Sequence, residues 1–212
     1  FSRREIVPGK TIIGVVAEAR SALSTEAEKT FRAAADELVR RGFTVVDVSV
    51  PGWELFAVVH RIVASVEASS SAGRYDSVRY GKRVPGGENW NEMYLLSRGA
   101  AFGPLVKNFL LQGAYFQFER YAAYEDACRI RARLLAEIGA AAGKAGFLMF
   151  PSPDAAPASE PGTLDGFYSR FAGTLFANVA GLPALYLPPA QGAAGFQLAA
   201  PQQRLKGQHL EP

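Results

Sequence analysis

A strand, a helix and a second strand follow one another within the first 50 residues, and this succession limits the possible folds more than any other feature. Residues 11–17 form a short continuous apolar run, which is typical of a strand buried on both faces in a parallel sheet. Residues 25–41 carry apolar side chains at helical spacing, and Thr25 with Glu28 forms a capping box at their start. Residues 43–48 are rich in β-branched side chains, which favour a strand. The pattern predicts a right-handed crossover between two parallel strands.

The rest of the chain continues this alternation and predicts an α/β fold. Helical patterns and short apolar strands follow in turn: helices over 53–70, 104–142 with a bend near Gly113, and 163–179, and strands over 147–150, 184–187 and 196–199. The last two strands form a hairpin pair in this interpretation, so we expect a mixed sheet flanked by helices. With 212 residues and 49% hydrophobic content, the chain is long enough for one full core. We predict a single domain over residues 1–212, with extended tails at 1–10 and 201–212.

Charge and cysteine content exclude several classes of function. The 23 Lys and Arg residues stand against 20 Asp and Glu and are scattered, which gives no direct sign of nucleic-acid binding. No apolar run approaches the roughly 20 residues that cross a bilayer, so a soluble protein is expected. Cys128 is the single cysteine, and with His60 and His209 it cannot complete a four-ligand zinc site without carboxylates. We therefore expect no metal, no cofactor and a reducing, intracellular compartment; because the sequence opens at Phe1, an organellar location, mitochondrial or plastid, is a further expectation.

The motifs of common enzymes are missing or incomplete. Gly14 stands alone after the first strand, so there is no G-x-G-x-x-G dinucleotide fingerprint. Residues 139–145 are one residue short of a phosphate-binding loop and end in Ala where Ser or Thr would hold magnesium. Neither His60 nor His209 accompanies a G-x-S-x-G motif. Cys128 falls within a predicted helix, where a buried, unreactive thiol is the simpler interpretation.

One segment carries an unusual concentration of functional groups. Residues 67–81 read E-A-S-S-S-A-G-R-Y-D-S-V-R-Y-G, a helix end followed by a loop whose guanidinium and phenol groups can bind a ligand or hold the loop together. This run resembles the E-A-S-S-N-L-x-R-Y-D-G-V-R-Y-G segment of the amidase signature family, in particular of its glutamyl-tRNA(Gln) amidotransferase A subunits. The likeness continues, in the family's order and spacing, over 9–15, 42–51, 102–107, 150–157, 178–184 and 195–198.

The resemblance implies the C-terminal half of the family fold and a loss of its chemistry. The family's Ser, cis-Ser and Lys triad belongs to the N-terminal half, and no G-G-S-S-G-G-like run occurs here, so we expect no catalytic residue in this chain. The Arg and Asp that hold glutamine in the family's A subunits align with Lys107-Asn108-Phe109 and with Phe171, which cannot make the same charged contacts. Tyr80 matches the family's pocket Tyr, and we interpret it as a vestigial substrate-binding residue.

These implications predict a protein that is not an enzyme on its own. We expect a catalytically inactive amidase-like pseudoenzyme that serves as a structural or accessory subunit of a larger complex. In the family fold this half supplies strands to one continuous sheet, so alone it should leave a strand edge that other protein subunits cover. The alternative is the C-terminal half of a split amidase, or of a split amidotransferase A subunit, that hydrolyses an amide only with a separate triad-bearing N-terminal chain. A third interpretation is a fragment of a longer active protein.

Overall fold

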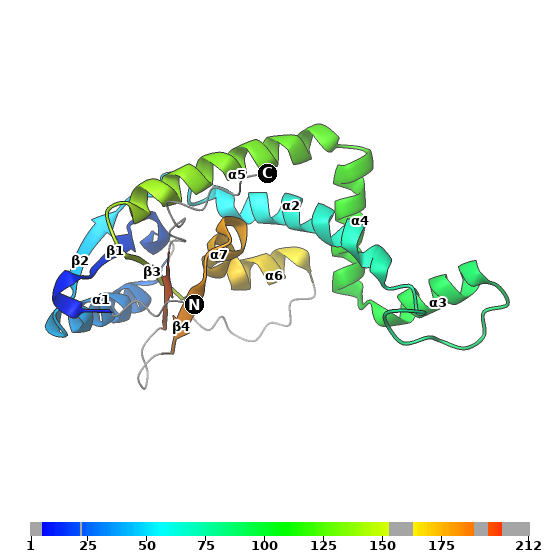
Figure 1. Ribbon diagram of the computed structural model, residues 1–212, viewed down its shortest axis with the longest axis horizontal. Helices are drawn as coiled ribbons and strands as arrows, with labels where there is room; N and C mark the ends of the chain where they lie inside the picture. Colours follow the sequence, from blue (N-terminus) through cyan, green and yellow to red (C-terminus); the bar gives the residue numbers. More distant parts are fainter. Residues whose placement is uncertain (1–5, 22, 153–162, 189–194, 201–212) are drawn as a thin grey trace, which may run out of the picture. The chain divides into compact units, whose positions relative to one another are not determined.

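The computed structural model describes residues 6–21, 23–152, 163–188 and 195–200 (Figure 1). The strands in this part of the chain are β1 (Ile12–Val16), β2 (Thr44–Val48), β3 (Phe147–Pro151), β4 (Ala184–Leu187) and β5 (Phe196–Ala199). The α-helices are α1 (Thr25–Arg40), α2 (Leu55–Ser71), α3 (Trp90–Ala101), α4 (Pro104–Phe118), α5 (Tyr121–Ala142), α6 (Leu164–Phe171) and α7 (Leu175–Ala180). Short 3-10 turns are η1 (Pro8–Lys10), η2 (Glu18–Arg20), η3 (Ala72–Arg74) and η4 (Ala172–Thr174). No helix within these ranges is long and apolar enough to cross a membrane.

The strands form one mixed sheet in the order β2-β1-β3-β5-β4. β1 pairs in parallel with β2 and with β3, which confirms the predicted strand–helix–strand unit at the start of the chain. β5 is antiparallel to both β3 and β4, and the β4–β5 pair is the predicted hairpin. The expected mixed α/β fold is therefore confirmed.

Both faces of β3 are covered, which explains why its sequence is apolar throughout. Met149 on one face belongs to a buried cluster with Phe31 of α1. Phe150 points to the opposite face, because successive side chains of a strand alternate. There it stacks on Phe176 of α7, with ring centroids 3.7 Å apart, and on Trp53, with centroids 5.3 Å apart. Full burial of side chains of this size contributes about 1.5–3 kcal/mol each.

The chain divides into two compact units. The sheet unit comprises residues 1–56, 131–158 and 170–212, and the helical unit comprises residues 57–130 and 159–169. Helices α2, α5 and α6 each contribute residues to both units. The single domain over residues 1–212 stays a prediction.

Close contacts between α2 and its neighbours hold the helical unit together. Gly113 of α4 lies so near α2 that a Cβ atom there would be 1.9 Å from the Ser65 carbonyl oxygen. Arg61 donates to Asp165 of α6 at 2.6 Å, and the Nδ1 atom of the adjacent His60 lies 3.0 Å from the hydroxyl of Tyr168, also in α6. Close packing at Gly113 therefore joins α2 to α4, and the contacts of Arg61 and His60 join α2 to α6.

Several local predictions need correction, among them the single helix over 163–179, which the structure divides into α6, the turn η4 and α7. The helix predicted over 104–142 does not bend at Gly113 but breaks at residues 119–120, giving α4 and α5. The N-cap of α1 is Ser24, whose side chain accepts from the Ala27 N–H, one residue before the predicted cap. Helix α3 was not predicted at all, although Asn89 caps it by accepting from the Glu92 N–H. In the predicted tail 1–10, residues 8–10 form the turn η1, and the other tail, 201–212, lies outside the described residues.

Candidate functional site

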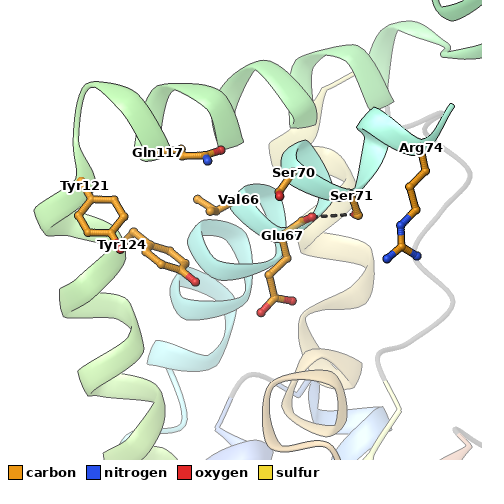
Figure 2. A pocket seen from close by; sticks show the side chains of 8 residues that line it. All are labelled: Val66, Glu67, Ser70, Ser71, Arg74, Gln117, Tyr121 and Tyr124. Atoms are coloured by element: carbon orange, nitrogen blue, oxygen red, sulfur yellow. Dashed lines mark hydrogen bonds between the residues drawn. The ribbon is translucent and has the colours of Figure 1, made fainter. Parts of the chain in front are cut away.

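An open cavity of about 470 Å³ lies in the helical unit, beside the segment that the sequence singled out (Figure 2). Its lining residues come from three helices and one turn: Val66, Glu67, Ser70 and Ser71 of α2, Arg74 of η3, Gln117 of α4, and Tyr121 and Tyr124 of α5. Figure 2 shows the two tyrosines on one side of the cavity and the α2 side chains on the other. Half of the lining therefore belongs to the predicted 67–81 segment.

The C-terminal end of α2 forms one side of the cavity, and one of its serines makes a hydrogen bond within the helix. The Ser71 hydroxyl donates to the Glu67 carbonyl oxygen at 2.7 Å, a back-bond that is typical of Ser near a helix end. The chain then tightens into η3, where Arg98 of α3 donates to the Ala72 carbonyl oxygen. This contact ties the turn that carries Arg74 to a neighbouring helix, while Glu67 and Arg74 stay exposed at the cavity.

The side of the cavity opposite α2 contains two neighbouring tyrosines. Tyr121 and Tyr124 lie three residues apart on α5, with ring centroids 5.7 Å apart. Burial, a hydrogen bond with Cys128 and the negative charge of Glu67 raise the pKa of Tyr124. The Tyr124 phenol is therefore neutral at physiological pH.

The loop after η3 is held by a single carboxylate. Asp76 Oδ1 accepts from the N–H groups of Val78, Arg79 and Tyr80 at 2.9, 2.8 and 3.2 Å. These backbone hydrogen bonds hold the pKa of Asp76 well below its usual range. Ser77 adopts φ +61°, a left-handed conformation that favours Gly, and its buried hydroxyl has no hydrogen-bond partner within the described part of the chain.

Tyr80 lies in this loop and not among the residues that line the cavity. Its side chain is 58% exposed, and its carbonyl oxygen accepts from the Ser77 N–H at 2.9 Å. Asn108 and Phe171, at the positions aligned with the family's charged contacts, are also exposed and outside the lining. The predicted role of Tyr80 as a vestigial substrate-binding residue stays a prediction.

The lining residues can bind a polar ligand. None of the eight is Lys or His, the residues that most often activate a serine, and Glu67 is the one carboxylate that lines the cavity with Ser70 and Ser71. His60 is half-buried against Tyr168, and burial lowers its pKa. Across the described ranges, no group of three or more His, Cys, Asp or Glu side chains is arranged to hold a metal ion. His209 lies outside those ranges.

A comparison with protein-family models matches residues 2–203 to the family described as Amidase. The chain belongs to the amidase family. Two curated relatives, the A subunits of the glutamyl-tRNA(Gln) amidotransferases of Maricaulis maris and Nitratidesulfovibrio vulgaris, are 35% and 37% identical to it. The alignments cover 88% and 85% of this chain but 39% and 38% of those relatives. The chain thus spans about two fifths of the length of the curated relatives it matches.

Solved structures of amidase-family proteins share the fold. The chain superposes on a crystal structure of an amidase with a TM-score of 0.67 and 24% identity, covering 92% of this chain and 42% of that one. The A subunit of the Thermotoga maritima glutamyl-tRNA(Gln) amidotransferase gives a TM-score of 0.60 at 20% identity, with 91% and 39% coverage. In both, this chain corresponds to a part of a longer amidase-family polypeptide, which agrees with the predicted C-terminal half.

Proposed function

We propose that this chain is a catalytically inactive protein, similar to an amidotransferase A subunit, that serves as a structural or accessory component of a larger complex. The observation that carries the proposal is the coverage: the family match extends over residues 2–203, yet the chain spans only about two fifths of its relatives. The sequence motif expected to hold the catalytic triad falls in the part of the family that the chain does not span. A polypeptide with this content binds and supports but does not attack an amide carbonyl.

The composition of the cavity supports the proposal that the chain does not hydrolyse amides. Hydrolysis of an amide through a serine needs a base within hydrogen-bond reach, usually His or Lys, and the lining contains neither; its one carboxylate is Glu67. Glu67 and Arg74 can orient a polar ligand, and Tyr124 can donate a hydrogen bond to it. On this proposal the cavity is a remnant that contributes to packing or binding, and Tyr80 is retained in the same vestigial sense.

A second candidate is the C-terminal half of a split amidase that works with a separate triad-bearing N-terminal chain. The feature that favours it is the cavity itself, because half of its lining comes from the 67–81 run that resembles the family segment. The resemblance to the A subunits, which hold glutamine, makes glutamine the first substrate to test. Asn108 and Phe171 argue against glutamine, since neither can pair with a carboxylate or an ammonium group as Arg and Asp do.

Two measurements test these candidates. The purified 212-residue chain is incubated with glutamine, asparagine and an aryl amide, and ammonia release is followed; we expect no turnover above a protein-free blank. Release of ammonia from any of the three by the chain alone contradicts both candidates. The tagged chain is then purified from its native source under gentle conditions and analysed by native mass spectrometry. A complex of several proteins without a triad-bearing amidase chain supports the accessory role, whereas a one-to-one complex with such a chain supports the split amidase.

A further inference from the structure

Glu67 and Arg74 line the same cavity with opposite charges, yet the two side chains do not pair. Both are exposed, and within the described residues neither the Glu67 carboxylate nor the Arg74 guanidinium forms an ion pair or a hydrogen bond. Elsewhere in the helical unit an acid and a base within reach of each other do pair, as Arg61 and Asp165 do at 2.6 Å. The cavity therefore presents one negative and one positive group that remain available to a ligand.

The spacing of the two residues along the chain keeps them apart. Seven residues are close to two helical turns, so Glu67 and Arg74 lie on the same face, and Figure 2 shows their side chains extending in the same direction. Ion pairs on a helix form between residues three or four apart, which this pair is not. Because α2 continues directly into η3, rises of about 1.5 and 2.0 Å per residue place residues 67 and 74 about 12 Å apart along the axis.

The two tyrosines lie near the acidic group. Burial raises the pKa of Tyr124, and the negative charge of Glu67 adds to this effect, so the carboxylate and the phenol are neighbours. Tyr121 lies beside Tyr124, with ring centroids 5.7 Å apart. An ammonium group at this end meets a carboxylate and aromatic rings, two partners that attract cations. Val66 adds an apolar contact to the same lining.

We propose that the cavity binds an extended zwitterion, with its ammonium end at Glu67 and the tyrosines and its carboxylate end at Arg74. An apolar stem joins the two ends and contacts Val66. The guanidinium of Arg74 matches a carboxylate in shape and can hold both of its oxygens. An α-amino acid carries both charges on one carbon, so it cannot reach Glu67 and Arg74 at once. This inference rests on the proposed function in one respect, that the cavity binds a ligand without reacting with it.

A set of probes with one chain length tests the two ends separately. The zwitterion is 8-aminooctanoate, whose charged groups lie about 10 Å apart when the chain is extended. Octanoate and octylamine keep the chain and lose one charge each, and glutamine carries both charges on one carbon. Binding to the full 212-residue chain is followed by NMR titration. Because contacts between exposed charges are weak, we expect millimolar affinity for 8-aminooctanoate, about fivefold tighter than for each of the other three.

Two substitutions assign the ends. Glu67→Gln should lower the affinity for 8-aminooctanoate to that for octanoate and leave octanoate binding unchanged. Arg74→Gln should lower it to that for octylamine and leave octylamine binding unchanged. Both side chains are exposed, so neither substitution removes a core contact. Glu125→Gln, which removes an exposed acid outside the lining, is the matched control and should bind all four probes as the wild type does.

The remaining outcomes contradict the proposal. No binding of 8-aminooctanoate, equal binding of a probe with one charge, or an unchanged affinity in either cavity variant overturns it. Binding of glutamine as tight as that of 8-aminooctanoate overturns it in favour of an α-amino-acid site. Ammonia release by the isolated chain would contradict the proposed function and leave these affinities unchanged, whereas absence of binding leaves the accessory role standing, so the two failures are distinguishable.

Discussion

The contact between α4 and α2 gives a quantitative prediction at Gly113. In Gly113→Ala, the added Cβ would lie 1.9 Å from the Ser65 carbonyl oxygen and 2.4 Å from its carbonyl carbon. Both atoms are backbone, so the contact is relieved only if one helix moves. Overpacking of this kind costs about 1–3 kcal/mol, and a backbone clash belongs at the upper end. Replacing Gly by Ala within a helix returns about 1 kcal/mol, so the net loss is about 2 kcal/mol.

The assay is thermal unfolding followed by circular dichroism, with Gly99→Ala as the control. A loss of about 2 kcal/mol lowers the Tm by about 4–8 °C in a chain of this size. Gly99 is also inside a helix, α3, but a Cβ there meets nothing within 4 Å, so Gly99→Ala should keep or raise the Tm. If Gly113→Ala is as stable as Gly99→Ala, the two helices are not in the close contact described, and the reasoning is refuted.

Three further predictions concern individual side chains. Ser77→Gly should stabilise the chain by about 1 kcal/mol, because it removes both a left-handed Ser and a buried hydroxyl without a partner in the described residues; a Tm below that of the wild type would contradict this. Burial lowers the pKa of His60, so this side chain binds a proton at higher pH in the unfolded chain than in the folded chain. The free energy of unfolding should therefore fall as the pH drops below about 6.5. In urea unfolding, His60→Gln should show a smaller change of this free energy with pH than the wild type. Glu137 accepts from the buried Gly52 N–H at 2.7 Å, so Glu137→Ala should cost about 1.5–3 kcal/mol in urea unfolding, while Glu137→Gln, which keeps an acceptor oxygen, should cost less than half as much; equal losses would exclude this hydrogen bond as the cause.

The sheet was predictable from the sequence because its signals are local. The predicted strands at 184–187 and 196–199 have the same bounds in the structure, because turn residues on both sides mark where each short apolar run begins and ends. Gly113 was misjudged for a physical reason: its role is to let two helices approach, and the partner, Ser65, lies 48 positions away along the chain and in another helix. The missed helix α3 is different, because its Asn89 cap and Glu92 were visible in the sequence.

Half of the residues that line the candidate site belong to a segment that could be predicted from the sequence. Glu67, Ser70 and Arg74 belong to the segment whose composition drew attention to it, and the structure places them around a cavity. Gln117 and Tyr124 reach the same cavity from α4 and α5, and nothing in the local sequence connects those helices with the end of α2. Tyr80 shows the converse case, since it belongs to the motif but lies outside the lining.

The chain contains two tryptophans, and one falls in each compact unit. Trp53 is half-buried and stacked on Phe150, whereas Trp90 at the start of α3 is 56% exposed. Their emission spectra should therefore differ, with Trp53 the bluer and the less accessible to acrylamide quenching. A Trp90→Phe variant isolates the signal of the sheet unit, and comparing its melting curve with the loss of helical ellipticity reveals whether the two units melt in one cooperative step or in succession.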